Sequence, residues 1–558
     1  MKTKKIIGIL LVACMAISML AACAAPSRAP AAAPAGTGPF AEHLTINWWR
    51  SGGSGAAAYT TEFMRWMEER YNITIVTSNN TAENDEQMNL LLATGEMPDF
   101  GGFYTTKEFM EQHGLVRSFP RSFIYDFAPD YAAVLDADPY GWVINDVIGG
   151  SEDEQITIRF YNKYLQGLYW FNLFRLDWLE NVGVAPKGSL VELDDRMYFT
   201  ESAYTLDEFT DIMDKFRNDD PDKNGQKDTW GISHGPYLHY SYYGLIGAFG
   251  VGGIAWGEET ILENGRIIPV HISDAYKEFL KYISGLANRG LIDPESATQG
   301  LWDAWEKYAA GNHGWQALLR DYVDVRYNNR PPYSILAADP DAKLLITPPV
   351  IGPDGKQMAP VAADQGYGAP VFYFGKNASD AVVERILRIL DSTVNDPETW
   401  VKFSIGYEGL DFKWEGEPWN SACEFLVIED EEASLQRGAR SFNLGIITNE
   451  MSKFMQPGGV QILSDFAMSP AGKKMGVYSS YSGDVNDDFV EEKQHFSDFY
   501  KADYDPVLAK FFADAVLGMD IDANWDKYIA DLKKAGLDYL MELIQKYPTY
   551  EETFGKLN

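Results

Sequence analysis

Strand-like and helix-like hydrophobic patterns alternate along the first hundred residues after position 40. Strand-like runs show β-branched and aromatic residues, and helix-like runs repeat apolar residues every three or four positions. In chain order the segments are a strand at 44–49, a helix at 62–71, a strand at 72–76, a helix at 85–94 and a short strand at 100–104. This rhythm is typical of an α/β unit built on a parallel sheet.

Beyond residue 164 the pattern becomes mainly helical. Thr205 and Glu208 form a capping box, with Thr205 as N-cap, and predict a helix that runs to about Phe216. Further predicted elements are helices at 273–289, 300–310 and 379–390, a strand-like run at 371–374 and a mostly helical last hundred residues. The sequence therefore predicts a large α/β protein, and it shows no internal repeat.

The amino terminus has the pattern of a secretory signal peptide. Three lysines precede an apolar run at 6–20 that is shorter than the roughly 20 residues a spanning helix needs. Residues 20–23, Leu-Ala-Ala-Cys, resemble the bacterial lipobox, which implies lipidation (palmitate) at Cys23 and removal of residues 1–22. The alternative is a plain signal peptide with an incidental cysteine. Residues 23–40 then hold the lipidated Cys23 and an Ala/Pro-rich flexible tether.

Composition and charge narrow the class of ligand. The formal charge of the 558-residue chain is −34, and it becomes about −37 without residues 1–22, which carry three lysines and no acid. This balance excludes nucleic acid, because its binding depends on Lys and Arg, and it disfavours polyanionic sugars. The chain holds 15 Trp, 32 Tyr and 30 Phe, more than one ordinary domain needs for its core. Cys423 has no disulfide partner and is expected to be a buried apolar residue.

Four motifs, in order along nearly the whole mature chain, resemble the family 1 extracellular solute-binding proteins of ATP-driven sugar importers. The likeness is to the large lipoprotein branch of Gram-positive bacteria, related to alginate-binding proteins. The motifs lie at 93–99, at 175–183 with 205–209, at 220–231, and at 518–538. A fifth stretch, 406–412, departs from the family pattern at its His and Tyr places, so only Glu408 is carried over from it.

The resemblance implies an α/β, two-lobe periplasmic-binding-protein-like fold (type II), with hinge crossings and a ligand cleft between the lobes. Lobe 1 would hold residues 44–165 plus 340–402, and lobe 2 residues 166–339 plus 403–558. It further implies a monomer at the extracellular face of the cell membrane, held there by its lipid anchor alone. The protein would capture an oligosaccharide and deliver it to the permease subunits of an ABC-type importer.

The loop at 220–228 has the spacing of a calcium site. Oxygen-bearing side chains recur at nearly alternate positions, a glycine follows the third, and the Gln226 carbonyl would fill the next place. The candidate ligands are Asp220, Asp222, Asn224, Gln226 and Asp228. The bidentate acid of an EF-hand is missing, since Gly231 stands at the twelfth place. The sequence favours a structural calcium ion over the alternative, a polar turn without an ion.

Aromatic side chains that could stack on sugar rings are the candidate ligand residues. Trp256 follows a glycine-rich stretch, and Trp49 ends the first strand. The predicted ligand-binding residues are Trp256, Trp49, Glu408 and Tyr367, with Trp170, Phe171, Trp315, Tyr407 and Trp414 as further candidates. For any one aromatic, a place in the core is the more common alternative.

A cell-surface glycan-degrading enzyme (a glycoside hydrolase or lyase) is the alternative function. Such a hydrolase needs two carboxylates facing one bond, and no motif singles out a pair. Residues 231–235 match Gly-x-Ser-x-Gly, but Pro236 and the stretch after it give no sign of the helix that a nucleophile elbow requires. The sequence therefore favours a binding protein with no catalytic residues.

Overall fold

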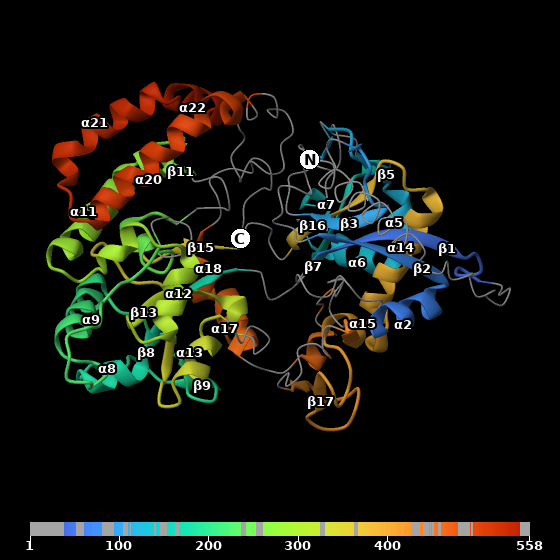
Figure 1. Ribbon diagram of the computed structural model, residues 1–558, viewed down its shortest axis with the longest axis horizontal. Coiled ribbons are helices and arrows are strands. Elements are labelled where there is room, and N and C mark those ends of the chain that lie inside the picture. Colours follow the sequence, from blue (N-terminus) through green and yellow to red (C-terminus); the bar gives the residue numbers. More distant parts are fainter. Residues whose placement is uncertain are drawn as a thin grey trace, which may run out of the picture.

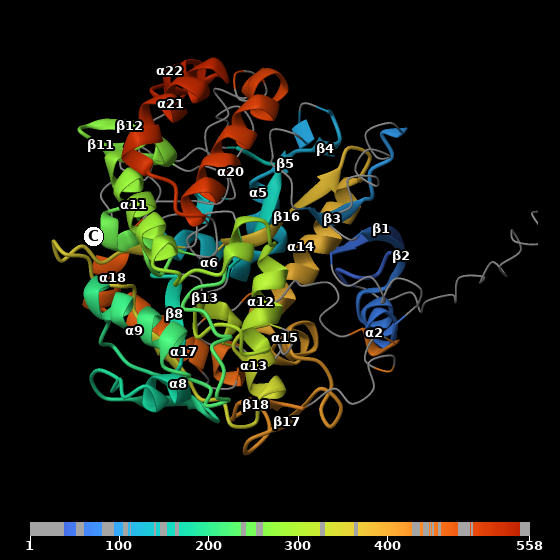
Figure 2. The same cartoon turned by 60° about the vertical axis from the view of Figure 1, so that its left-hand side comes forward.

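The computed structural model places the chain in two groups of elements, each around its own sheet (Figure 1, Figure 2). The structure describes the ranges 38–51, 61–80, 94–103, 110–138 without 112, 141–144, 153–161, 167–235, 242–252, 260–323, 330–361, 367–426, 451–455, 459–477 and 495–546. It also describes the isolated residues 433, 436–438, 446, 448 and 492.

The first lobe is built on a six-stranded sheet with the order β2-β1-β3-β16-β4, and β7 also pairs with β16. β1 pairs in parallel with β2 and β3, whereas β16 runs antiparallel to β3. Its strands are β1 (Leu44–Ser51), β2 (Ile73–Asn80), β3 (Phe100–Phe103), β4 (Val116–Arg117), β7 (Thr157–Tyr161) and β16 (Tyr367–Gly375), and β5 (Phe119–Pro120) pairs with β6 (Glu154–Gln155) beside them. Its helices are α2 (Glu62–Tyr71), α5 (Ser122–Phe127), α6 (Pro129–Ala137), α7 (Gly141–Ile144) and α14 (Asp380–Asn395).

The second lobe contains a five-stranded sheet with the order β13-β8-β14-β10-β9. β8 runs antiparallel to both of its neighbours, so β13 and β14 point the same way. The strands are β8 (Trp170–Arg175), β9 (Val191–Asp194), β10 (Met197–Phe199), β13 (Trp315–Leu319) and β14 (Leu344–Thr347), with a separate hairpin β11 (Thr260–Glu263) and β12 (Arg266–Pro269). The helices are α8 (Leu176–Asn181), α9 (Leu206–Asn218), α11 (Asp274–Asn288), α12 (Leu301–Ala309), α13 (Tyr333–Ala338), α17 (Gly459–Met468), α18 (Pro470–Met475), α20 (Ala502–Val516), α21 (Ile521–Lys534) and α22 (Leu537–Ile544).

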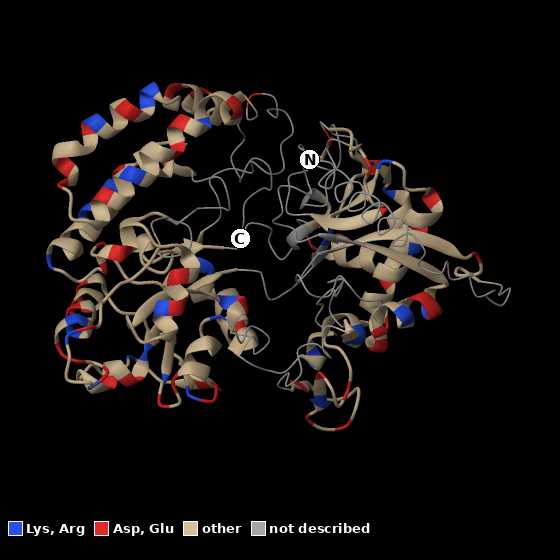
Figure 3. Ribbon diagram, in the orientation of Figure 1, with Lys and Arg blue, Asp and Glu red and all other residues tan. Residues whose placement is uncertain are grey.

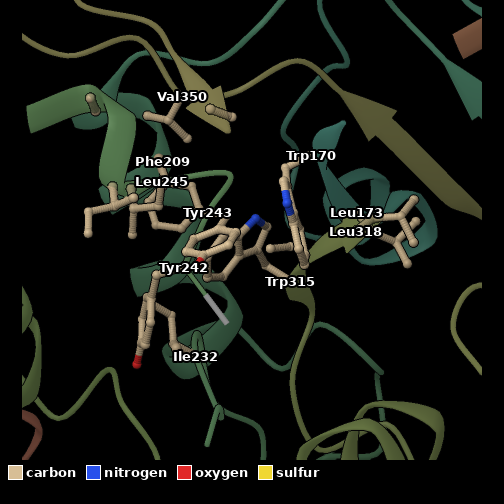
Figure 4. Packing of buried hydrophobic residues seen from close by; sticks show 14 of the residues in the cluster. Trp170, Leu173, Phe209, Ile232, Tyr242, Tyr243, Leu245, Trp315, Leu318 and Val350 are labelled. Carbon is tan, nitrogen blue, oxygen red and sulfur yellow. The ribbon is translucent and has the colours of Figure 1, made fainter. Parts of the chain in front are cut away.

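Each lobe has its own core. Trp48, Phe100 and Phe372 belong to the core of the first lobe, and Trp170 and Trp315 belong to that of the second. Figure 4 shows Trp170 and Trp315 close together beside Tyr242 and Tyr243. Two separate hydrophobic cores in one chain are expected for a protein of this length.

The chain passes from one lobe to the other beside the start of β8. β7 belongs to the first sheet, and Leu168, just before β8, forms a bridge with Val361. Val361 in turn follows β15 (Ala359–Pro360), which pairs with β19 (Gly476–Val477), and the chain then enters β16 of the first sheet. Segments far apart in sequence therefore meet where the two lobes join.

Two of the expected lobe boundaries are corrected by the pairing. β14 lies between β8 and β10, so residues 344–347 belong to the second sheet and not to lobe 1. Residues 412–425 form a hairpin, β17 (Phe412–Trp414) and β18 (Cys423–Phe425), that packs with α15 (Pro397–Ser404) and the short helix Met451–Phe454. Phe403 of α15 contacts Phe63 of α2 at 4.9 Å between ring centres, so this group adjoins the first lobe. The place of β14 depends on its long-range pairing with β8, and the place of the hairpin depends on the contact of α15 with α2, neither of which the local pattern encodes.

Most predicted elements are confirmed, and so is the α/β class. The parallel β1–β2–β3 pairing and the capping box of Thr205 and Glu208 are present as expected, and Ser379 caps α14. Residues 85–93 of one predicted helix lie outside the described residues. In the part of the chain that is described, no helix has both the length and the apolar character to cross a membrane.

Candidate functional site

Of the four predicted ligand residues, the structure describes the side chains of Trp49 and Glu408. Trp49 is a core residue, which corrects its expected place beside a ligand: it is 3% exposed and packs on Phe103 at 4.8 Å between ring centres. Glu408 is exposed in a turn that bridges to Phe412. Tyr367 begins β16, but its side chain lies outside the description, as does the whole of Trp256. Cys23 also lies outside the described residues.

The further aromatic candidates are mainly core residues. Trp170, Phe171 and Trp315 are at most 1% exposed. Trp315 donates its indole N–H to Asn172 Oδ1 at 3.0 Å. Asn172 also donates to the carbonyls of Gly244 and Pro348, so this buried amide ties three segments together. Inward-facing aromatics of this kind stabilise the lobe and leave no face for a ligand.

Ser233 of the Gly-x-Ser-x-Gly match is fully buried. Its hydroxyl donates to Asp293 Oδ2 at 2.8 Å and accepts from Gln299. Burial raises the cost of a charged imidazole and lowers the pKa of the neighbouring His234 to about 3. A nucleophile needs an exposed hydroxyl, so this serine is structural.

The loop at 220–228 folds its oxygen atoms around the amide of Asn224. Asn224 Nδ2 lies 2.8 Å from Asp222 Oδ2 and 3.1 Å from Asp228 Oδ2. Asp220 accepts the backbone N–H of Gly225 at 3.0 Å. Burial, together with the nearby carboxylates of Asp220 and Asp228, raises the pKa of Asp222. In this loop the Asn224 amide thus joins two carboxylates, Asp222 and Asp228, while Asp220 is held by the backbone N–H of Gly225.

The oxygen atoms of this loop are of the kind that binds calcium, but in this structure they are not arranged around a common centre. Among the described residues, no three His, Cys, Asp or Glu side chains are grouped so that they could hold a metal ion as they stand. The Asn224 amide nitrogen occupies the position between Asp222 and Asp228. Asn224 Oδ1 accepts the backbone N–H of Gln226 at 2.7 Å, so an ion that draws this oxygen toward the carboxylates would have to replace that hydrogen bond. Calcium prefers such a set of oxygen ligands.

A group of aromatic and basic residues lies at the carboxyl end of β13, beside the segments where the chain crosses between the lobes. Trp170 at the start of β8 pairs with Leu319 at the end of β13. The next residue, Arg320, is fully buried, and it donates from its backbone to the Tyr169 carbonyl and from its guanidinium to the Leu168 carbonyl at 2.9 Å. Burial lowers the pKa of Arg320 to about 10, so the guanidinium stays charged at neutral pH.

A chain of aromatic contacts connects this group to α12, where the last ring is exposed. Tyr322 contacts Trp305 at 5.6 Å between ring centres, and Trp305 contacts Trp302 at 5.0 Å. Trp305 is 8% exposed, whereas Trp302 is 55% exposed. The sequence alone does not reveal this group, because its members come from α12 and from the short helix Arg320–Tyr322 that follows β13. The one local signal was the pair Trp302 and Trp305, three positions apart on a predicted helix.

Acidic and basic residues alternate along the described helices of both lobes. Figure 3 shows Asp and Glu interspersed with Lys and Arg along these helices.

Comparison with known proteins supports the resemblance found in the sequence. No family model matches the chain. It is 25% identical over 268 residues to the polygalacturonan/rhamnogalacturonan-binding protein YtcQ of Bacillus subtilis, a match that covers 47% of this chain and 47% of YtcQ, about half of that relative's length. It is 21% identical over 495 residues to the lipoprotein LipO of the same organism, covering 83% of each chain.

Solved structures match nearly the whole chain. The substrate-binding protein FusA of S. pneumoniae in complex with kestose covers 90% of this chain and 98% of its own, with a TM-score of 0.65 and 17% identity. The alginate-binding protein AlgQ2 without calcium ion covers 90% and 97%, with a TM-score of 0.60 and 15% identity. This chain has the fold of the extracellular solute-binding proteins.

With that fold, the expected resemblance to family 1 solute-binding proteins is confirmed. The solute-binding fold also explains why the crossings lie beside β8, since they join two lobes that each fold around a separate core. None of the relatives named above is described as an enzyme.

Proposed function

We propose that the protein is an extracellular solute-binding protein that captures an oligosaccharide and hands it to the permease subunits of an ABC-type importer. The observation that carries the proposal is the pair of separately packed lobes joined beside β8, matched across most of its length by FusA with kestose. Two bodies with separate cores can close on a ligand by a hinge motion. We place the ligand between the lobes, near the carboxyl ends of the strands.

The enzyme alternative has no supporting geometry among the described residues. The one nucleophile pattern, at Ser233, is buried and hydrogen-bonded to Asp293. A binding protein returns its ligand unchanged, whereas a hydrolase or lyase shortens it. A thermal-shift screen tests the proposal, because a ligand that binds only the folded state raises the melting temperature by mass action.

The screen uses three sugars of different chemistry: kestose, a trigalacturonate and the N-glycan fragment Man5GlcNAc. A rise in melting temperature with at least one sugar, and no shortened product in the same sample, supports the proposal. Product formation supports the glycan-degrading enzyme instead. No response to any sugar counts against carbohydrate as the ligand.

We further propose that calcium binds the loop at 220–228 and stabilises it. The ligands would be carboxylate oxygens of Asp220, Asp222 and Asp228, the Asn224 side chain and the Gln226 carbonyl. An EF-hand mutant of FusA and a calcium-free form of AlgQ2 are among the solved structures with this fold, which supports a calcium site in related proteins. The loop follows α9, and Asn181 donates to the Pro221 carbonyl within it, so a bound ion would fix this corner of the second lobe.

The amino-terminal pattern supports a membrane-anchored, extracellular location, in line with the lipoprotein LipO. In this proposal Cys23 carries the lipid and residues 24–40 form the tether. The variant Cys23→Ala should then move from the membrane fraction to the medium or stay unprocessed. Unchanged lipid labelling and membrane retention of that variant would exclude Cys23 as the anchor.

A further inference from the structure

Trp302 is the most exposed tryptophan among the described residues, and its surroundings hold it in place. Its ring contacts Trp305 edge-to-face at 5.0 Å, and Trp305 is packed against Tyr322. An indole that is 55% exposed leaves apolar surface in water, although its neighbours already fix its position. A rigid exposed aromatic loses little conformational entropy when a ligand covers it.

Arg330 completes the group from another segment. Its guanidinium carbon lies 5.4 Å from the centre of the Trp302 ring and 5.0 Å from that of Tyr322. It also donates to the Tyr322 hydroxyl at 3.0 Å. The surface thus combines one broad apolar face with fixed hydroxyl and guanidinium groups, the combination that specific small-ligand sites use.

The surroundings fit a sugar ring better than a protein partner. Trp302 is the exposed large apolar residue of α12, and Asp303 and Glu306 of the same helix are exposed beside it in the sequence. A protein interface needs a broad patch with an apolar centre, whereas α12 offers one indole among charged residues. A sugar ring presents an apolar C–H face edged with hydroxyls.

The position of this group in the second lobe indicates which part of a ligand it would contact. Tyr322 follows β13, whose end pairs with the start of β8 next to the crossings. β13 is an edge strand of the second sheet, and Trp302 lies two ring contacts beyond Tyr322, through Trp305. A ligand held between the lobes would therefore meet this group, at the margin of the second sheet, with one of its ends.

We propose that Trp302, Tyr322 and Arg330 form a stacking subsite for an outer ring of the bound oligosaccharide. The inference rests on the proposed capture of an oligosaccharide and adds to it where one end of the ligand lies. Trp302 supplies the stacking face, and Arg330 with the Tyr322 hydroxyl supplies hydrogen bonds to ring hydroxyls. The subsite sets a preference for longer ligands over disaccharides.

The test compares Trp302→Ala with wild type by isothermal titration. The probes are whichever series responds in the thermal-shift screen: sucrose, kestose and nystose, or galacturonate oligomers of two to four rings, or mannose-containing fragments of increasing length. Truncation of a well-packed aromatic contact costs about ten-fold in Kd, and this loss is expected for the longer members only. The control is Trp419→Ala, since Trp419 is also an exposed tryptophan (43%), on the β17–β18 hairpin.

The expected result is weaker binding of the longer ligands by Trp302→Ala, with Trp419→Ala and the disaccharide affinity unchanged. A second readout is intrinsic fluorescence: the change on saturation should shrink in Trp302→Phe. Wild-type affinity of Trp302→Ala for every ligand length overturns the subsite and leaves the proposed function standing. Equal loss for all lengths overturns its outer position. A wild-type protein that binds no sugar overturns the proposed function, and the subsite with it.

Discussion

Trp302 and Trp315 lie on neighbouring elements of the second lobe and have opposite surroundings. Trp302 stands on α12 and is 55% exposed, whereas Trp315 begins β13 and is completely buried, with its N–H bonded to Asn172. The same residue type is a structural anchor in one place and a surface available to a ligand in the other. Burial and hydrogen bonding, which depend on distant segments such as β8, separate the two roles.

The largest expected effect is on the buried member of the pair. Trp315→Ala should lower the free energy of unfolding by about 3–5 kcal/mol, because it leaves a cavity and an unpaired Asn172 oxygen. Trp302→Ala should change it by less than about 0.5 kcal/mol, as for most surface substitutions. Urea titrations followed by circular dichroism measure both. Equal destabilisation by the two variants would remove the contrast between core and surface.

The second-largest expected effect is a loss of folding stability at acid pH, caused by two buried histidines. His234 and His313 are buried with ring centres 5.6 Å apart, close to Tyr242, Tyr308 and Trp315. Burial lowers the pKa of His234 to about 3, and burial, with the charge of His234 and of Lys307, also lowers the pKa of His313. Folding therefore favours the neutral rings, while the unfolded chain binds protons below its ordinary histidine pKa of about 6.5.

The stability that the neutral rings confer is fully present above pH 6.5 and is lost as the pH falls toward the folded-state pKa. At pH 5 the loss from His234 is about 2 kcal/mol relative to pH 7, and His313 contributes a loss of the same sign. Unfolding measured at both pH values should show a smaller difference in the double variant His234→Gln and His313→Gln than in wild type. An unchanged pH dependence in that variant would mean that other groups cause the acid sensitivity.

The expected gain in stability from calcium binding to the second lobe is smaller. Saturating the loop with ion at about one hundred times its Kd should stabilise the wild type by about 2.7 kcal/mol, and a chelator should remove this gain. Asp222→Ala combined with Asn224→Ala should melt at the same temperature with and without chelator. A wild-type melting curve that ignores chelator would leave the loop as a polar turn without an ion.

The smallest of these effects concerns a helix end on the surface of the same lobe. Thr205 accepts the backbone N–H of Glu208, and the Glu208 carboxylate accepts the backbone N–H of Thr205 at 2.7 Å. Thr205→Ala should cost about 1 kcal/mol in unfolding free energy, and Thr205→Ser should cost less. If Thr205→Ala melts like wild type, the cap is replaced by another partner for the Glu208 N–H.

Local features of the fold could be predicted from the sequence, and pairings over long distances could not. The helix that begins after Thr205 and the strands at Leu44 and Ile73 follow from local periodicity and capping. The place of β14 in the second sheet follows from its pairing with β8, about 170 positions earlier, which no local pattern reports.

The candidate site was harder to predict for the same reason. Trp49 was expected to end its strand, but β1 continues to Ser51, and the Trp49 side chain packs against Phe103. Trp302 contacts Arg330, and its neighbour Trp305 contacts Tyr322, and both partners lie on other segments. The loop at 220–228 is different, because all its oxygen donors lie within nine positions, so the local sequence contains the whole of the cation site that it predicts.

The central claim is that the molecule binds an oligosaccharide and releases it unchanged. The most direct test is isothermal titration of the purified chain with the sugar that raises its melting temperature, followed by chromatography of the recovered ligand. The account predicts saturable binding of one ligand per chain and recovery of the sugar at its original length. Failure to bind, or recovery of shortened fragments, would contradict it.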